Sequence, residues 1–236
     1  MDSYVVVDLE TTGLAPKRDR ILEIGAFKII DGKCEERFHS LVNPGRPIPE
    51  RVVALTGIDD AMVAGSEPVG RVIREFTDFA GALPLLGHNL MFDYAFLKHG
   101  AVNEKLDFER SGVDTLKICR KLFPNLESRS LEAMCRYYHI EQERAHRAAD
   151  DARVTGLLFE RLKKDFMAEA PEVFAPKPLL YKAKKQSPIT NAQKGYLNDL
   201  LKYHTIKFDV QIDSLTKSEA SRLIDGIILQ YGRIHR

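Results

Sequence analysis

The sequence predicts an α/β fold: a mixed sheet whose first strands are antiparallel, with helices packed on it, followed by a small C-terminal helical module. Three observations predict this fold. Strand-like segments fill most of the first 42 residues, and helical and strand-like segments then alternate to about residue 167. A segment rich in proline and lysine then separates two strongly capped helices from everything before them.

The first three strands are predicted from short apolar segments and one turn signal. Residues 4–8 form a β-branched run, and residues 21–30 and 34–42 are the next two candidates. Between them lies Asp31-Gly32, a dipeptide favoured in two-residue hairpins. We therefore expect an antiparallel meander, followed by a proline-rich loop.

The middle of the chain alternates helices with a further strand. Apolar residues recur at helical spacing over residues 68–80, and a short apolar run predicts a buried strand at 83–87. A long helix is expected from residue 148 to 167. Asp114 and Ser130 are the expected N-caps of two shorter helices, because both residue types accept hydrogen bonds from the first helical amides. The shorter helices are expected at 93–99, 114–122 and 130–138.

The composition changes after residue 168 and predicts three parts. We expect a main domain at residues 1–168, a linker at 169–188 and a helical hairpin module at 189–236. Prolines and the lysines of the linker are typical of an extended connection; these lysines are Lys182, Lys184 and Lys185. Two capping-box pairs predict the starts of the hairpin helices: Thr190 with Gln193, and Thr216 with Glu219.

Composition and charge exclude several classes of protein. With 44% hydrophobic residues, a mean hydropathy of −0.25 and a net charge of +1, the chain is neither disordered throughout nor a strongly basic polyanion binder. No apolar run approaches the ~20 residues of a membrane span, and the acidic start lacks a secretory signal, so we expect a cytoplasmic protein. Three widely spaced cysteines predict reduced thiols.

Two carboxylates are predicted at the end of the first strand. Asp8 and Glu10 are two residues apart, so in a strand both side chains point to the same face. Thr11, Thr12 and Gly13 follow and add hydroxyl groups and a close backbone approach. The alternative is that a strand simply runs into a polar turn.

Two more inward acids are predicted on helices. Asp93 shares a helical stripe with Phe96 and Leu97, although it could instead cap its helix. On the long helix, Asp151 lies on the apolar stripe, whereas Asp150 falls toward solvent with neighbouring arginines. His146 precedes this helix and is expected in the loop before it.

Four converging acids would repel one another, and divalent cations would remove the conflict. Oxygen ligands favour Mg²⁺ or Mn²⁺, and two such ions some 3.5–4 Å apart suit hydrolysis of a phosphodiester. His146, with an ordinary pKa near neutrality, is suited to accept the proton of the attacking water.

Asp-x-Glu, a later Asp and His-x4-Asp, in this order, resemble the DEDDh exonucleases, the superfamily of the proofreading epsilon subunit of bacterial replicative DNA polymerase. The resemblance implies a ribonuclease H-like fold and stepwise hydrolysis of single-stranded nucleic acid from its 3′ end, releasing nucleoside monophosphates. It covers residues 4–162 and is carried by four motifs: DLETTG, LTGI, GHNLMFDYAFL and HRAADDA.

The resemblance also implies roles for individual residues. Asp8, Glu10 and Asp151 would hold the catalytic metal ions, Asp93 would assist, and His146 would be the general base. Nine further positions match the pocket for the terminal nucleotides: Thr11, Thr12, Gly13, Leu14, Thr56, Gly57, Ile58, Asn89 and Phe92.

The leading hypothesis is therefore a metal-dependent 3′–5′ exonuclease acting on 3′ ends of single-stranded DNA. An exoribonuclease that trims RNA 3′ ends is a second hypothesis, because a 2′-hydroxyl is recognised by one or two polar contacts. A catalytically silent module that binds single strands or a polymerase is a third, which the complete set of acids argues against. The C-terminal module is a candidate docking site for a DNA polymerase or another replication or repair protein, and no membrane partner is expected.

Overall fold

A six-stranded mixed sheet in the order β3-β2-β1-β4-β5-β6 forms the centre of the computed structural model, which describes residues 1–234. The β1·β2, β2·β3 and β5·β6 pairs are antiparallel, and β1·β4 and β4·β5 are parallel. Asp31 and Gly32 both have positive φ, as the predicted hairpin turn requires. The strands are β1 (Tyr4–Thr11), β2 (Ile21–Ile30), β3 (Lys33–Leu41), β4 (Leu85–Gly87), β5 (Ser111–Asp114) and β6 (Lys177–Pro178).

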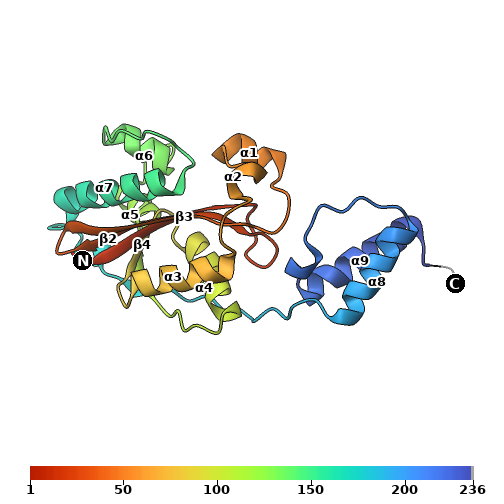
Figure 1. Ribbon diagram of the computed structural model, residues 1–236. Coiled ribbons are helices and arrows are strands. Elements are labelled where there is room, and N and C mark those ends of the chain that lie inside the picture. The colour runs from red at the N-terminus through yellow and green to blue at the C-terminus, as the bar shows by residue number, and fades with distance from the viewer. Residues whose placement is uncertain (235–236) are drawn as a thin grey trace. The chain divides into compact units, whose positions relative to one another are not determined.

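Helices cover both faces of this sheet (Figure 1). On β1, Val5, Val7 and Leu9 pack toward α3 and α4, whereas Tyr4 and Val6 pack toward α5, α6 and α7. Because side chains alternate along a strand, Asp8 and Glu10 belong to the face that carries α7. The helices are α3 (Val69–Ala80), α4 (Met91–Asn103), α5 (Thr115–Leu122), α6 (Leu131–Tyr137) and α7 (Ala148–Phe166). The predicted mixed sheet flanked by helices is confirmed.

Two short helices follow the predicted proline-rich loop, in a segment for which the sequence predicted no element. They are α1 (Glu50–Thr56) and α2 (Asp60–Val63). Pro49 stands at the N-cap of α1, a place that tolerates proline because no helical amide is needed there. Their apolar residues bury Leu22 of β2 in a separate small core. Of the prolines in the predicted loop, Pro49 therefore stands at the start of a helix.

The chain divides into two compact units, Met1–Pro44 with Ile48–Ala183, and Gly45–Pro47 with Lys184–Arg236. The first unit thus includes residues 169–183, which were predicted to be linker. Within them lies a 3₁₀ helix, η1 (Pro171–Phe174), and Phe174 and Leu179 are almost fully buried. The prolines of this segment suggest an extended linker, but burial of these two apolar side chains holds the segment against the rest of the first unit.

The second unit contains α8 (Asn191–Tyr203), the 3₁₀ helix η2 (Ile212–Ser214) and α9 (Lys217–Tyr231). Both predicted capping boxes are present, with Thr190 and Thr216 as the N-caps. Leu197 and Leu200 of α8 and Ala220 of α9 are fully buried in a core of their own. Among the described residues, no helix is long and apolar enough to cross a membrane.

Candidate active site

The end of β1 supplies the first two acids of the site. β1 continues to Thr11, so Asp8 and Glu10 lie within the strand and share the α7 face. The Glu10 side chain is buried, with 9% of the residue exposed. β4 pairs with β1 only at Val5 and Val6, so the following part of β1 has no strand partner on that side.

Asp93 fills part of this gap. It lies in the first turn of α4, is 3% exposed, and accepts a hydrogen bond of 3.1 Å from the Leu9 backbone amide. The N-cap of α4 is Leu90, so the capping alternative is not what the structure shows. The side chain is instead directed at the backbone of β1, next to the two strand acids.

Helix α7 brings Asp151 to the same place. Asp151 is 8% exposed and accepts hydrogen bonds from Gln142 Nε2 at 2.6 Å and from the His146 backbone amide at 3.2 Å. Asp150 pairs instead with Arg153 at 2.7 Å. The helical register predicted for the adjacent aspartates is correct, because the inward position belongs to Asp151.

His146 lies in the loop before α7, as expected, and its side chain is exposed. Its φ of 60° is in the left-handed region, which is uncommon for a residue other than glycine. One ligand atom from each of Glu10, His146 and Asp151 lies within 4.8 Å of the other two. The loop therefore holds an imidazole beside two buried carboxylates.

Electrostatics show that these carboxyls crowd one another. Burial, and then the charges of Asp93, Asp151 and Glu10, raise the pKa of Asp8 well above its ordinary value. Burial likewise raises the pKa of Asp93. The pKa of Glu10 rises to about 8, first through burial and then through Asp151 and Glu23, and burial raises that of Asp151 to about 6.

Such a donor set fits a divalent cation. A cation would compensate the buried negative charges, and carboxylate oxygens are the ligands that hard cations prefer. Of the four acids predicted as metal ligands, Glu10 and Asp151 belong to a group of side chains that could hold an ion, and its third member is His146, which was predicted as a base. Asp8 and Asp93 are not members of that group.

Glu23 is a fifth acid at this site, and sequence reasoning missed it. It lies on β2 directly opposite Glu10, and its side chain is fully buried. Burial alone would raise its pKa, but hydrogen bonds from His39, Arg147 and the Ala148 amide outweigh burial and lower the pKa to about 2. A lone glutamate within the apolar run of β2 was the signal that could have found it.

The nine predicted nucleotide-pocket positions differ in their accessibility. Thr12, Thr56 and Ile58 are buried, and the Thr56 hydroxyl bonds the Val52 carbonyl at 2.9 Å. These three side chains pack inside the fold and do not face solvent. Leu14 is 83% exposed and Asn89 is also exposed. Four further positions are partly or fully accessible: Thr11, Gly13, Gly57 and Phe92.

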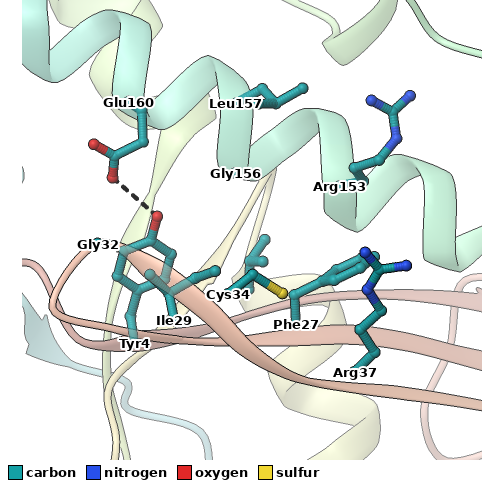
Figure 2. Close-up of a pocket in the computed structure, with 11 residues that line it drawn as sticks. Tyr4, Phe27, Ile29, Gly32, Cys34, Arg37, Arg153, Gly156, Leu157 and Glu160 are labelled. Carbon is teal, nitrogen blue, oxygen red and sulfur yellow. Dashed lines mark hydrogen bonds between the residues drawn. The ribbon is translucent and has the colours of Figure 1, made fainter.

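A cavity of about 310 Å³ lies elsewhere, between α7 and the strands β1–β3 (Figure 2). Its lining is mostly apolar and includes Phe27, Ile29 and Leu157, with Arg37 and Arg153 together at one end. None of the four predicted metal-binding acids lines it. The acidic cluster is therefore a separate feature of the molecule.

A known protein family matches the part of the chain that carries this site. The family described as "Exonuclease" (RNase_T) matches residues 5–159, a span that contains all four acids and His146. The chain belongs to this exonuclease family. The family membership, the enzyme class and the ribonuclease H-like fold predicted from the DEDDh resemblance are thus confirmed.

This exonuclease is similar to part of much larger polymerases. It is 31% identical over 243 residues to the DNA polymerase III PolC-type of Lacticaseibacillus paracasei. This alignment covers 96% of this chain and 17% of the polymerase. With the PolC-type polymerase of Bacillus cereus it is 36% identical over 172 residues, 72% of this chain and 12% of the polymerase. The chain therefore spans about a sixth or less of these relatives.

Solved structures share the fold. Exonuclease X in complex with 5′-overhanging duplex DNA is 27% identical, with a TM-score of 0.56 over 69% of this chain and 92% of that chain. Exonuclease I of E. coli in complex with a dA16 oligonucleotide is 21% identical, with a TM-score of 0.64 over 74% and 42% of the two chains.

Proposed function

We propose that this exonuclease removes nucleotides from the 3′ ends of single-stranded DNA and releases nucleoside monophosphates. The observation that carries the proposal is the convergence of Asp8, Glu10, Asp93 and Asp151 with His146, from three elements far apart in sequence, at the end of β1. A binding module has no need for buried acids that raise one another's pKa. The family match supports nuclease chemistry for the same residues.

Asp8, Glu10 and Asp151 would hold two Mg²⁺ or Mn²⁺ ions, with Asp93 assisting from α4. Such ions would lower the pKa of a water, so that it gives up a proton and attacks phosphorus as a stronger nucleophile, and would stabilise the leaving oxygen. The protein's part is to keep Glu10, Asp93 and Asp151 buried and to hold two of them in place by hydrogen bonds. Asp93 accepts a hydrogen bond from the Leu9 amide, and Asp151 accepts hydrogen bonds from the Gln142 side chain and the His146 amide.

His146 would accept the proton of the attacking water. Its side chain is exposed and so accessible to a substrate, and its backbone amide donates a hydrogen bond to Asp151. General-base catalysis needs the imidazole within hydrogen-bond reach of that water, which the proximity to Glu10 and Asp151 supports. Leu14, Asn89 and Phe92 are among the predicted substrate contacts that are accessible, and Phe92 offers a ring for stacking on a base.

DNA is the proposed substrate because the relatives named above are DNA polymerases and two solved neighbours hold DNA. The same relatives support association with a DNA polymerase. The alignment with the L. paracasei polymerase covers 96% of this chain, so it reaches into the second unit. We therefore propose α8 and α9 as the polymerase-docking part.

The experiment is a degradation time course with 5′-labelled oligonucleotides of one sequence, as DNA and RNA, single- and double-stranded. We expect single-stranded DNA to shorten stepwise from its 3′ end in Mg²⁺ or Mn²⁺, with no shortening in excess chelator. Faster shortening of RNA would support the exoribonuclease hypothesis. Shortening in chelator, or none under any condition, would contradict the proposal.

Two matched variants control for contaminating nucleases. Asp8→Ala removes one acid of the cluster and should abolish shortening. Asp78→Ala removes an exposed acid of α3 and should leave shortening unchanged. Equal activity of Asp8→Ala and wild type would mean that the shortening does not come from this site.

A further inference from the structure

Glu23 bonds protein groups with both of its carboxylate oxygens, although it lies beside the acids of the candidate metal site. Oε1 accepts hydrogen bonds from Arg147 Nη2 at 2.6 Å and is 2.7 Å from His39 Nε2. Oε2 accepts from Arg147 Nε at 3.1 Å and from the Ala148 amide at 2.9 Å. Both oxygens are therefore engaged by protein groups, which leaves Glu23 poorly placed to bind a cation although it lies opposite Glu10.

The contact with Ala148 caps helix α7 from a different element. Ala148 is the first residue of α7, and its N-cap, Arg147, makes no side-chain capping bond. The first amides of a helix need acceptors and favour a negative charge. Glu23 supplies both from β2, across 125 residues of sequence.

Gly25 explains how the helix comes so close to the strand. It lies two residues after Glu23 and so on the same face of β2. A Cβ at Gly25 would lie 2.2 Å from the Ala149 backbone nitrogen, a distance that no side chain allows. The first turn of α7 therefore rests directly on β2, with Glu23 as its anchor.

His146 immediately precedes Arg147, which Glu23 binds. Its amide bonds Asp151 on one side, and the residue after it, Arg147, is clamped by Glu23 on the other. The left-handed φ of His146 needs such constraints, since a residue other than glycine seldom adopts it unaided. The backbone on both sides of the imidazole is thus fixed.

We propose that Glu23 is a positioning residue that, through Arg147 and the first amide of α7, holds His146 beside Glu10 and Asp151. The proposal rests on the proposed role of His146 as the general base. Both Glu23 oxygens bond protein groups, so Glu23 acts by fixing the turn from which the imidazole projects.

The test compares Glu23→Gln in two backgrounds, wild type and His146→Ala, in the full chain. Glutamine keeps the shape of the side chain, but only one of its two terminal atoms accepts hydrogen bonds. It therefore loses part of the contact with Arg147 and Ala148. With saturating Mg²⁺ and oligonucleotide, kcat should fall about 10–100-fold in the wild-type background, the usual effect of losing a group that orients a site residue, with KM changed less than about threefold.

In the His146→Ala background the same change should have less than about a threefold effect, because residues that act through one another are not additive. A merely structural Glu23 would slow both backgrounds by the same factor, and that result would overturn the proposal. Hydrogen exchange at the Ala148 amide gives a second readout that does not depend on activity or metal. Exchange should become at least about tenfold faster in Glu23→Gln.

Failure of the proposed function would look different. If His146→Ala keeps the wild-type kcat, the base assignment is wrong, and hydrogen exchange alone then decides whether Glu23 fixes the turn; unchanged exchange overturns the positioning role. If Glu23→Gln does not fold, Arg147→Lys replaces it, because lysine keeps the charge but loses the two-pronged contact. Arg144→Lys is the matched control, an exposed arginine of the same loop, and should leave kcat and exchange unchanged.

Discussion

Replacing Glu10 by glutamine should stabilise the metal-free protein, and more strongly at pH 7 than at pH 5. The pKa of Glu10 is about 8 in the folded protein, against an ordinary value of 4.5. Between these values the folded state keeps a proton that the unfolded state releases. The free energy of unfolding therefore falls as pH rises from about 4.5 to about 8. This loss of stability is the free-energy penalty of the buried carboxyl. A glutamine side chain at this position does not titrate, so the variant does not carry the penalty.

The size of the effect follows from the two pKa values. For a single group with these values, the penalty is about 1 kcal/mol at pH 5 and about 3 kcal/mol at pH 7. The constant cost of exchanging a carboxyl for an amide cancels between the two pH values. The stability gained by Glu10→Gln should thus grow by about 2–3 kcal/mol over this range.

The assay is urea unfolding of wild type and variant at pH 5 and pH 7, both in excess chelator. Titration of groups that do not interact with Glu10 is common to both proteins and drops out of the difference. Asp8 and Asp93, whose pKa values the Glu10 charge raises, change in the same direction and add to the gain. Glu35→Gln, at an exposed position of β3, is the control and should show no pH-dependent gain. A gain from Glu10→Gln that is the same at both pH values would refute the crowding of acids at the end of β1.

Three further predictions concern His146, the two adjacent aspartates of α7, and the lysines after residue 181. His146→Ala should slow the chemical step about 10²–10⁴-fold in single-turnover kinetics, while Mn²⁺ affinity by titration calorimetry changes little. Asp151→Asn should abolish turnover and Asp150→Asn should have a mild effect, since only Asp151 faces Glu10; the reverse order in steady-state assays would contradict the site. Replacing Lys182, Lys184 and Lys185 by glutamine should lower the salt slope of binding to a long single strand by about 2, near 0.7 per lost phosphate contact, if these lysines meet the substrate. An unchanged slope in a salt series would remove them from substrate binding.

Features that depend on local chemistry could be predicted from the sequence. The Asp31-Gly32 turn needs only residues that tolerate positive φ, and the caps at Asp114, Ser130 and Thr190 need only an oxygen next to the first helical amides. The inward direction of Asp151 followed from helical periodicity alone. In each case the interacting groups lie within a few residues of one another.

Features created by distant partners could not be predicted in this way. β5 has only four residues, and its strand character comes from pairing with β4. Phe174 is fixed by burial against another part of the chain, despite its proline-rich surroundings. Glu23 depends on Arg147, which lies 124 residues later, so an apolar strand pattern says nothing of its partner.

The most direct test of the central claim is Mn²⁺ binding and turnover measured together on the metal-stripped protein. Wild type should show no turnover in chelator, bind two Mn²⁺ in the presence of a nucleoside monophosphate, and regain stepwise removal of nucleotides from 3′ ends as the ions bind. Asp8→Ala should stay folded by circular dichroism, bind fewer ions and show no turnover. Full turnover by the metal-stripped protein in excess chelator, or by Asp8→Ala, would contradict a metal-dependent exonuclease built on the acids at the end of β1.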